Sequence, residues 1–336
     1  MPAIYSELKD MTLSAFKVAS LLIFIIGVIL CSILAFQLPV LDQLYFIDFI
    51  PDYVILFLFL PAIIFINKKR LYLFLTGCVF FVMSSSFQIN IANDLFEEDG
   101  IIDHRFKVAS FNIAQRVNAE KLYQFFKQES LDVLFVQEGS YDMFKDSAQY
   151  NLYGECVKRL CVLSKYALSQ LESLNRRALG GWGQYVSLHK INVGGNSVLL
   201  ANVHFASISN FGYRFNTFAG FLSKVSLFKD TKAIEFGLVK ALIEKWSDDE
   251  AIVVAGDFNL TDRNQQFTQY WGGFRNAFNE SGFGYGTTRK SWFLSPRIDH
   301  ILSSKRLSPV ATSVWHDMES DHYPVVSTLQ FIGRTE

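Results

Sequence analysis

The sequence has few charged residues and few prolines for its length. Of its 336 residues, 19% are charged and 7 are proline, whereas 50% are hydrophobic and 33 are phenylalanine. Disordered and low-complexity chains lack the apolar side chains that offset the loss of chain entropy on folding. The composition therefore excludes both classes and predicts a large buried core.

Positive charge and histidine are scarce in the first part of the chain. Residues 1–103 contain 5 of the 31 Lys and Arg residues and 10 of the 32 Asp and Glu residues, a net charge of −5. Residues 104–336 have a net charge of +4 and contain all 6 histidines. The mean hydropathy of +0.21 is high for a soluble protein. We therefore interpret the two parts separately.

Three apolar runs in the first part indicate a membrane region. Residues 18–36 and 71–87 are uncharged and long enough to cross a bilayer as helices. The run 54–66 is shorter, and two interpretations stay open: a third span extended by its neighbours, or a re-entrant or surface segment. We predict an N-terminal cytoplasmic segment (1–17), a membrane region (18–88) with about three transmembrane helices, an acidic linker (89–103) and a domain at 104–336.

The distribution of Lys and Arg predicts the orientation of these spans. Lys9 and Lys17 precede the first run and residues 68–70 are all basic, whereas residues 37–53 and 88–103 contain neither Lys nor Arg. Positive residues stay on the cytoplasmic side. Three spans therefore place the large domain outside the cytoplasm, and two spans would return it to the cytoplasm.

Cysteine is rare, and only Cys156 and Cys161 lie in the large domain. A short hairpin would bring them within disulfide range, which fits an oxidising compartment. Two unrelated buried thiols are the alternative. A metal pair is disfavoured because no further Cys or His stands nearby at ligand spacing.

Residues 104–336 read as one domain with alternating strands and helices. Helical patterns cover 119–130 and 231–246. The apolar strand-like runs are 106–114, 131–137, 156–164, 184–190, 197–205, 251–255, 297–303 and 325–331. This order predicts an α/β or α+β layered fold with helices covering sheets.

Polar residues stand at or beside the apolar runs. They are Asn112, Glu138, His204, Asp257 with Asn259, Asp299, and Asp321 with His322. Each alone is typical of a turn, a helix cap or a buried core histidine. A carboxylate is costly to bury without partners, and several at one sheet edge would form an oxygen-rich site suited to Mg²⁺ or Mn²⁺.

This ordered set resembles the endonuclease/exonuclease/phosphatase superfamily, the DNase I-like hydrolases, over essentially all of residues 104–336. The resemblance implies a four-layer α/β/β/α sandwich of two mixed sheets with helices outside. It also implies divalent-metal hydrolysis of phosphate esters, in nucleic acids, inositol phosphates, sphingomyelin or nucleotide derivatives.

The membrane region lies outside the match but resembles that of bacterial members with apolar N-terminal helices. We therefore expect a multi-pass protein of the bacterial inner membrane, with its catalytic domain outside the cytoplasm. The expected partners are the lipid bilayer and a phosphoester substrate, and no obligate protein partner is evident.

The resemblance also implies a role for each matching residue. Glu138 would bind Mg²⁺ (or Mn²⁺), with Asn112 and Asp321 as further ligands. Asp257 would orient or deprotonate the attacking water, and Asn259 would donate to the phosphoryl oxygens.

The remaining matches are histidines and their partner. His322 would contact the scissile phosphate, and Asp299 would fix its tautomer and favour its charged form. His204 would bind phosphate or act as an acid.

The substrate is less sharply indicated. Arg176 and Arg177 form a small basic cluster that suits an anionic ester. The stretch 205–228 is rich in Phe, for which three interpretations stay open: packing on the sheet, contact with the lipid interface, or stacking with single-stranded bases.

Three functions follow from this pattern. The favoured one is a metal-dependent phosphoesterase acting on a small or lipid-borne ester. A membrane-anchored nuclease is the second, and it predicts one groove lined by Arg176, Arg177, Arg275 and Arg289. A catalytically inactive binding module is disfavoured because every expected catalytic position is filled.

Overall fold

The computed structural model divides the chain into two compact units, Met1–Gln88 and Ile89–Glu336. The structure describes isolated positions before residue 105 and then residues 105–332, apart from 212–217, 248–249, 292–294 and 316–317. Most of the predicted membrane region and linker lies outside these residues. Among the residues described, no helix combines the length and apolar character needed to cross a membrane.

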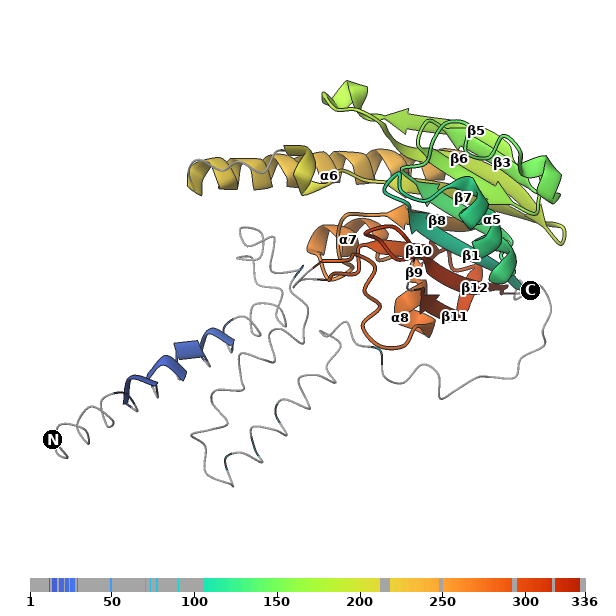
Figure 1. The fold of residues 1–336 in the computed structure, drawn as a ribbon. Coiled ribbons are helices and arrows are strands. Elements are labelled where there is room, and N and C mark those ends of the chain that lie inside the picture. Colours follow the sequence, from blue (N-terminus) through green and yellow to red (C-terminus); the bar gives the residue numbers. More distant parts are fainter. Residues whose placement is uncertain are drawn as a thin grey trace. The chain divides into compact units, whose positions relative to one another are not determined.

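Two six-stranded sheets form the second unit (Figure 1). The first sheet has the order β11-β12-β1-β2-β4-β3. Its only parallel pair is β1 with β2, and the other neighbours are antiparallel. Its strands are β1 (Arg105–Asn112), β2 (Val133–Gln137), β3 (Tyr153–Val157), β4 (Leu160–Ser164), β11 (Leu307–Val314) and β12 (Val325–Phe331).

The second sheet has the same kind of mixed topology, in the order β5-β6-β7-β8-β10-β9. Here β7 and β8 are parallel, and the other pairs are antiparallel. Its strands are β5 (Ser169–Asn175), β6 (Gln184–Val193), β7 (Asn196–His204), β8 (Ala251–Asp257), β9 (Arg275–Asn276) and β10 (Asp299–Ser303). The mixed two-sheet architecture predicted from the sequence is confirmed.

Alternating side chains build two cores. Phe106 and Val108 of β1 belong to a buried cluster that joins the two sheets, together with residues such as Leu200 and Val253. Residues farther along β1, such as Phe111, pack instead with helix α5 (Ala119–Gln128). Successive strand residues point to opposite faces, so one strand serves both layers.

Helices pack around the second sheet through aromatic side chains. Phe236 of α6 (Phe218–Trp246) and Trp271 of α7 (Gln265–Trp271) contact Phe205 and Phe258, which directly follow β7 and β8. A short helix, α8 (Ala277–Ser281), precedes β10. Aromatic burial therefore fixes the two chain segments that leave the strand ends.

The structure corrects several predicted elements. The run 156–164 is a hairpin of two strands, and the helix predicted at 231–246 begins at Phe218. The strands β5 and β11 were not predicted, because half or more of their residues are polar or small, no residue of β5 is buried and only part of β11 is buried. An apolar pattern is a weak signal for such strands.

The aromatic stretch contributes packing where the structure describes its side chains. Phe205 and Phe228 are both buried, at 0% and 1% exposure. The aromatic residues at 213 and 215 lie outside the described part. For Phe205 and Phe228, packing inside the domain is therefore the correct interpretation.

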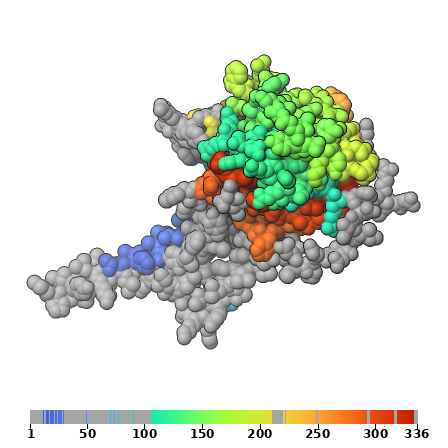
Figure 2. Space-filling view, turned by 45° about the vertical axis from the view of Figure 1, so that its right-hand side comes forward, coloured from blue at the N-terminus to red at the C-terminus, as the bar shows by residue number. Residues whose placement is uncertain are grey.

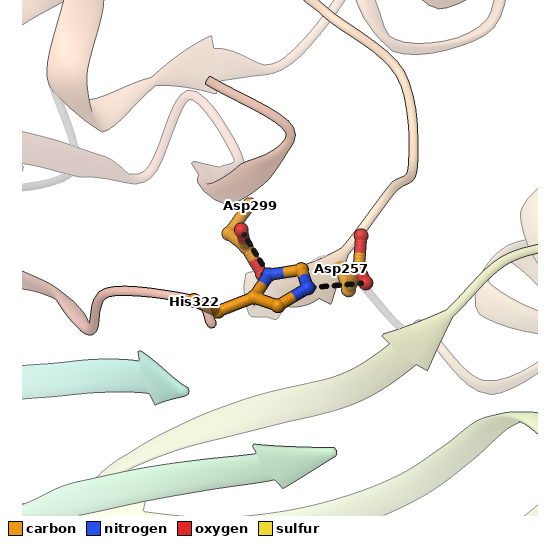
Figure 3. A group of neighbouring side chains, drawn as sticks. All are labelled: Asp257, Asp299 and His322. Atoms are coloured by element: carbon orange, nitrogen blue, oxygen red, sulfur yellow. Dashed lines mark hydrogen bonds and ion pairs between the residues drawn. The ribbon is translucent and has the colours of Figure 1, made fainter. Parts of the chain in front are cut away.

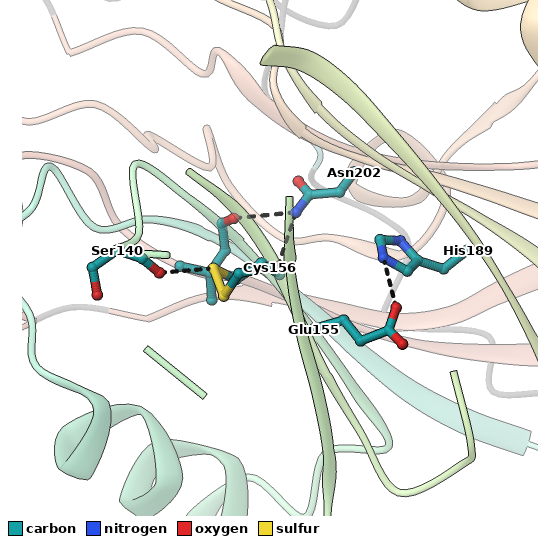
Figure 4. Close-up of a disulfide and its surroundings, with 7 residues drawn as sticks. Ser140, Glu155, Cys156, His189 and Asn202 are labelled. Carbon is teal, nitrogen blue, oxygen red and sulfur yellow. Dashed lines mark hydrogen bonds and ion pairs between the residues drawn. A yellow bond between two sulfur atoms is a disulfide. The ribbon is translucent and has the colours of Figure 1, made fainter. Parts of the chain in front are cut away.

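The hairpin of β3 and β4 is closed by a disulfide between Cys156 and Cys161 (Figure 4). The two residues are direct cross-strand partners. Val157 pairs with Leu160, which leaves Lys158 and Arg159 as a two-residue turn. Of the two interpretations of these cysteines, the structure adopts the disulfide.

Removing this disulfide should destabilise the domain. Replacing Cys156 and Cys161 by Ser should lower the free energy of unfolding by about 2 kcal/mol, because the bond restricts a short loop in the unfolded chain. Thermal unfolding of oxidised and reduced protein measures the effect. Equal melting temperatures for the oxidised wild type and the double variant would contradict it.

Candidate active site

The topology brings the predicted polar residues to one edge of the sandwich. Asn112 and His204 end β1 and β7, and their parallel partners are Gln137 and Asp257. Parallel strands end at the same side of a sheet. Asp299 opens the antiparallel β10 and lies opposite Asp257, so it reaches the same edge.

A buried polar bridge joins the two sheets just beneath this edge. Gln137 Nε2 donates to Asn202 Oδ1 at 2.8 Å, and Asn202 Nδ2 donates to the carbonyl oxygens of Cys161 and Val136 at 2.9 and 3.1 Å. Both amides are fully buried. Because unpaired buried amides are costly, this bridge fixes β7 against β2 and β4. It thereby places Glu138 and His204, which follow the two amides closely, near one another.

Asp257, Asp299 and His322 form a buried cluster (Figure 3). His322 Nδ1 lies 2.8 Å from Asp299 Oδ2, and Nε2 lies 3.8 Å from Asp257 Oδ2. Thr288 Oγ1 accepts from the backbone N–H of Asp299 at 3.0 Å and so holds this carboxylate. The predicted pairing of Asp299 with His322 is present in the structure.

The electrostatics of this cluster favour a charged imidazole. Burial by itself lowers the pKa of His322, but the carboxylates of Asp299 and Asp257 outweigh it and raise the pKa to about 9. His322 is therefore a cation at neutral pH.

Arg289 is a site residue whose place here was not predicted. Its guanidinium contacts His322 Nε2 and lies 2.8 Å from Asp321 Oδ2. Two cations thus share three carboxylates, Asp257, Asp299 and Asp321, which offsets their mutual repulsion. Arg289 lies in a loop among other polar residues, and nothing in its local pattern marks it as different from any surface arginine.

Asp257 receives hydrogen bonds on both carboxylate oxygens. Asn112 Nδ2 donates to Oδ2 at 3.0 Å, and the backbone N–H of Asn259 donates to Oδ1 at 2.8 Å. Asn112 Nδ2 also lies 3.4 Å from Glu138 Oε1. Its oxygen accepts from the N–H of Ala114, which fixes the amide orientation. Asn112 thus presents nitrogen to the carboxylates, an arrangement that orients them.

His204 differs from His322 in charge. Its Nε2 lies 3.7 Å from Asp257 Oδ2 and 3.8 Å from Glu138 Oε1. Burial lowers the pKa of His204, although the Asp257 carboxylate raises it in part. The imidazole is therefore neutral at pH 7, and the two histidines of the site differ in charge.

Backbone conformation is unusual at two site residues. Glu138 and Asn259 both have left-handed backbones, with φ of 57° and 48°. Residues other than glycine rarely adopt this backbone region, which costs of order 1 kcal/mol or more per residue. The sharp turns aim both residues out of their strands. Asn259 Nδ2 donates to the Phe205 carbonyl at 3.1 Å, which links the two strand ends.

The donor set fits a hard divalent cation. One ligand atom from each of Asp257, Asp299 and His322 lies within 4.8 Å of the other two. Asp321 Oδ1 is buried and has no hydrogen-bond partner among the residues that the structure describes, and the Glu138 side chain is 29% exposed. Carboxylate oxygens in this number suit Mg²⁺ or Mn²⁺. The Nδ1 atom of His322 is already bonded to Asp299, and Glu138 and Asp321, the metal ligands predicted from the sequence, lie outside this group of three.

Helix α6 holds the strand ends through two buried charged residues that were not predicted. Glu235 Oε1 pairs with Arg176 Nε at 2.6 Å, and Glu235 Oε2 accepts from the N–H of Ala206 at 2.7 Å. Lys232 Nζ contacts the Phe258 carbonyl. Both charged residues stand at helical spacing among the apolar residues of the buried helix face. This break in the apolar pattern is the signal in the sequence that could have revealed them.

The arginines proposed for substrate binding have different environments. Arg176 also donates to the backbone carbonyl oxygen of His204, so its guanidinium holds the backbone of this residue in place. Arg177 is exposed. Arg275 pairs with Glu280 at 3.2 Å, and Arg289 contacts His322. Three of the four arginines named for a nucleic-acid groove therefore have partners within the domain.

Comparison with known proteins identifies the family. The sequence model described as "Endonuclease/Exonuclease/phosphatase family" matches residues 109–322. The chain therefore belongs to the endonuclease/exonuclease/phosphatase family, whose members are hydrolases that act on phosphoesters. Among curated proteins, no sequence matches the chain.

Solved structures show the same fold. An endonuclease/exonuclease/phosphatase from Bacteroides vulgatus is 17% identical with a TM-score of 0.52, covering 68% of this chain and 100% of its own. TDP2 from D. rerio complexed with single strand DNA product is 15% identical with a TM-score of 0.52 and the same coverage. A family protein from Bacteroides thetaiotaomicron is 16% identical, with a TM-score of 0.50 and coverage of 68% and 99%.

The charge of His322 should make stability fall with rising pH. Because the folded pKa of His322 is about 9 and the ordinary value is 6.5, its contribution is complete below pH 6.5 and is lost as the pH rises to 9. The difference in unfolding free energy between wild type and His322→Asn should shrink by up to about 3 kcal/mol over this range. Chemical unfolding in EDTA at pH 6 and 9.5 tests this, and a constant difference would contradict it.

Proposed function

We propose that the protein is a divalent-metal-dependent phosphoester hydrolase that activates water for attack on phosphorus. The observation that carries this proposal is the Asp257 carboxylate, held at both oxygens and flanked by the cationic His322–Asp299 pair. A fixed carboxylate beside a fixed cation suits proton removal from water next to a bound phosphate.

Glu138 and Asp321 would hold the metal, with Asp257 close by. When bound, Mg²⁺ or Mn²⁺ would neutralise phosphate charge and polarise the ester. Asn112 keeps the carboxylates of Glu138 and Asp257 in fixed orientations through its amide nitrogen.

The remaining residues have separate tasks. Asp257 takes the proton of the attacking water. His322 and Arg289 bind the phosphoryl oxygens as cations, and charge develops on these oxygens in the transition state. His204 is neutral, so it supports phosphate binding by a hydrogen bond better than it supports proton donation. The second N–H of the Asn259 amide is free of the Phe205 bond and donates to the same group.

We also propose that the protein is anchored in a bacterial inner membrane with its catalytic domain outside the cytoplasm. The apolar runs 18–36, 54–66 and 71–87 and the basic residues 68–70 support this orientation. The disulfide of the β3–β4 hairpin supports an oxidising compartment.

Substitution of the proposed base tests the activity. Asp257→Asn should lower hydrolysis of bis-p-nitrophenyl phosphate by about 10²–10⁴-fold, because a neutral amide cannot accept the water proton. The assay uses the full chain in detergent with Mg²⁺ or Mn²⁺, and the exposed Asp230→Asn is the matched control. Equal loss in the control, or full activity of Asp257→Asn, would contradict the assignment.

Plasmid and single-stranded DNA in parallel assays distinguish a nuclease. Metal-dependent DNA cleavage that disappears in Asp257→Asn would favour the nuclease function over a small or lipid-borne ester.

A reporter fusion tests the orientation. Alkaline phosphatase joined after Glu336 should be active in a bacterial host, because this reporter matures only after export. Replacing residues 68–70 by Glu should reduce its activity if these charges set the topology. An inactive wild-type fusion with a fluorescent cytoplasmic reporter at the same position would overturn the proposed localisation.

A further inference from the structure

A pocket of about 620 Å³ opens beside the candidate metal ligand Glu138. Three short segments line it: residues 115–118 after β1, the loop that follows β2, and the turn between β3 and β4. These segments belong to the teal and green part of the chain, which forms one continuous face in Figure 2. Of the residues that line this pocket, only Glu138 has a role in the proposed hydrolysis.

Three cations surround this pocket, Arg116, Lys158 and Arg159. All three are exposed, and none forms an ion pair or a side-chain hydrogen bond with any residue that the structure describes. Most other cations near the site are paired, as Arg176 is with Glu235 and Arg289 is with Asp321. Cations that lack internal partners are available to a bound anion.

The N-terminus of helix α5 adds to the positive potential. Asn118 lines the pocket and caps this ten-residue helix, accepting from the N–H of Lys121 at 3.0 Å. The amide dipoles of a helix favour negative charge near its first turn. This contribution reinforces the three side-chain cations on the same wall.

The disulfide fixes two of these cations relative to Glu138. Lys158 and Arg159 are the turn residues of the hairpin that Cys156 and Cys161 close. The Arg159 carbonyl accepts from the N–H of Gly139, directly after Glu138, at 3.0 Å.

The disulfide also packs tightly against the loop after β2. Cys161 Sγ lies 3.4 Å from the Ser140 carbonyl oxygen. A Cβ on Gly139 would come within 3.1 Å of the same sulfur. The basic turn and the candidate metal ligand are therefore connected by short, rigid contacts.

We propose that this pocket is a second anion subsite, which binds a phosphate group of the substrate other than the one that is hydrolysed. The substrate class is then a compact organic phosphoester with at least two phosphate groups. This inference rests on the proposed function of the neighbouring site. The pocket volume falls in the range of small-molecule sites, about 300–1,000 Å³.

A long nucleic-acid strand fits these observations less well. Binding along a polymer backbone needs a continuous line of available cations. Here three available cations gather in one pocket, whereas Arg176, Arg275 and Arg289 have partners inside the domain. Tyr141 and Met143 give the pocket an apolar side that suits the organic part of a small ester.

Pyrophosphate binding tests the subsite without any requirement for turnover. The full chain in detergent, with EDTA present, is titrated with inorganic pyrophosphate by calorimetry. Lys158→Ala/Arg159→Ala should weaken binding about tenfold or more, because two charge-assisted contacts are lost. Arg116→Ala, on a different segment, should weaken it as well. The matched control is Lys127→Ala/Lys305→Ala, which removes two exposed charges, one from the last turn of α5 and one from the turn after β10.

The outcomes separate the subsite from the proposed hydrolysis. Unchanged affinity in the pocket variants, equal weakening in the control, or no binding by the wild type would each overturn the subsite. Melting temperatures verify that the variants are folded. Loss of pyrophosphate binding in the pocket variants supports the subsite even if the wild type hydrolyses no ester, which would contradict only the proposed function.

Discussion

The site depends on a buried hydrogen bond between the two sheets, from Gln137 to Asn202. Buried amide hydrogen bonds are directional, and Asn202 pairs with Gln137 and with two backbone carbonyls of the first sheet. These contacts favour one offset between β2 and β7, although Gln137 Oε1 has no hydrogen-bond partner among the described residues. This offset brings Glu138, on one sheet, close to His204 and Asp257 on the other. Sheet-on-sheet packing by apolar side chains alone tolerates small shifts that would separate these groups.

Charge is the second constraint on the site. Asp299 and Asp257 raise the pKa of the buried His322 and favour its charged form, Asp321 pairs with Arg289, and burial lowers the pKa of His204, which is neutral. The aromatic cluster around Phe205 and Phe258 excludes water on the α6 side. There Glu235 and Lys232 bond to backbone groups of the strand ends. Helix α6 is therefore both a covering layer and a support for the catalytic loops.

Local patterns were sufficient to predict a layered α/β or α+β fold and the strand-end residues, because apolar runs ending in polar residues can be recognised in short windows. The sandwich of two mixed sheets was predicted from the family resemblance. It was insufficient for β5 and β11, whose sequences alternate little, and for the early start of α6. It also assigned Arg176 to substrate binding. In the structure Arg176 pairs with the buried Glu235, a partner that no local pattern reveals, and its role in substrate binding stays a prediction.

The sequence by itself determined which side chains stand at strand ends, and its apolar runs predict a membrane region. Both depend on periodicity and composition within short windows. The tertiary structure alone decided which ends meet. It turned the nitrogen of Asn112 toward the carboxylates, placed Arg289 on His322, and joined Cys156 to Cys161 so that Lys158 and Arg159 stand beside Glu138. Apart from the disulfide, which a short hairpin closes, these contacts connect residues distant in the chain, and their energies depend on distances that no local pattern contains.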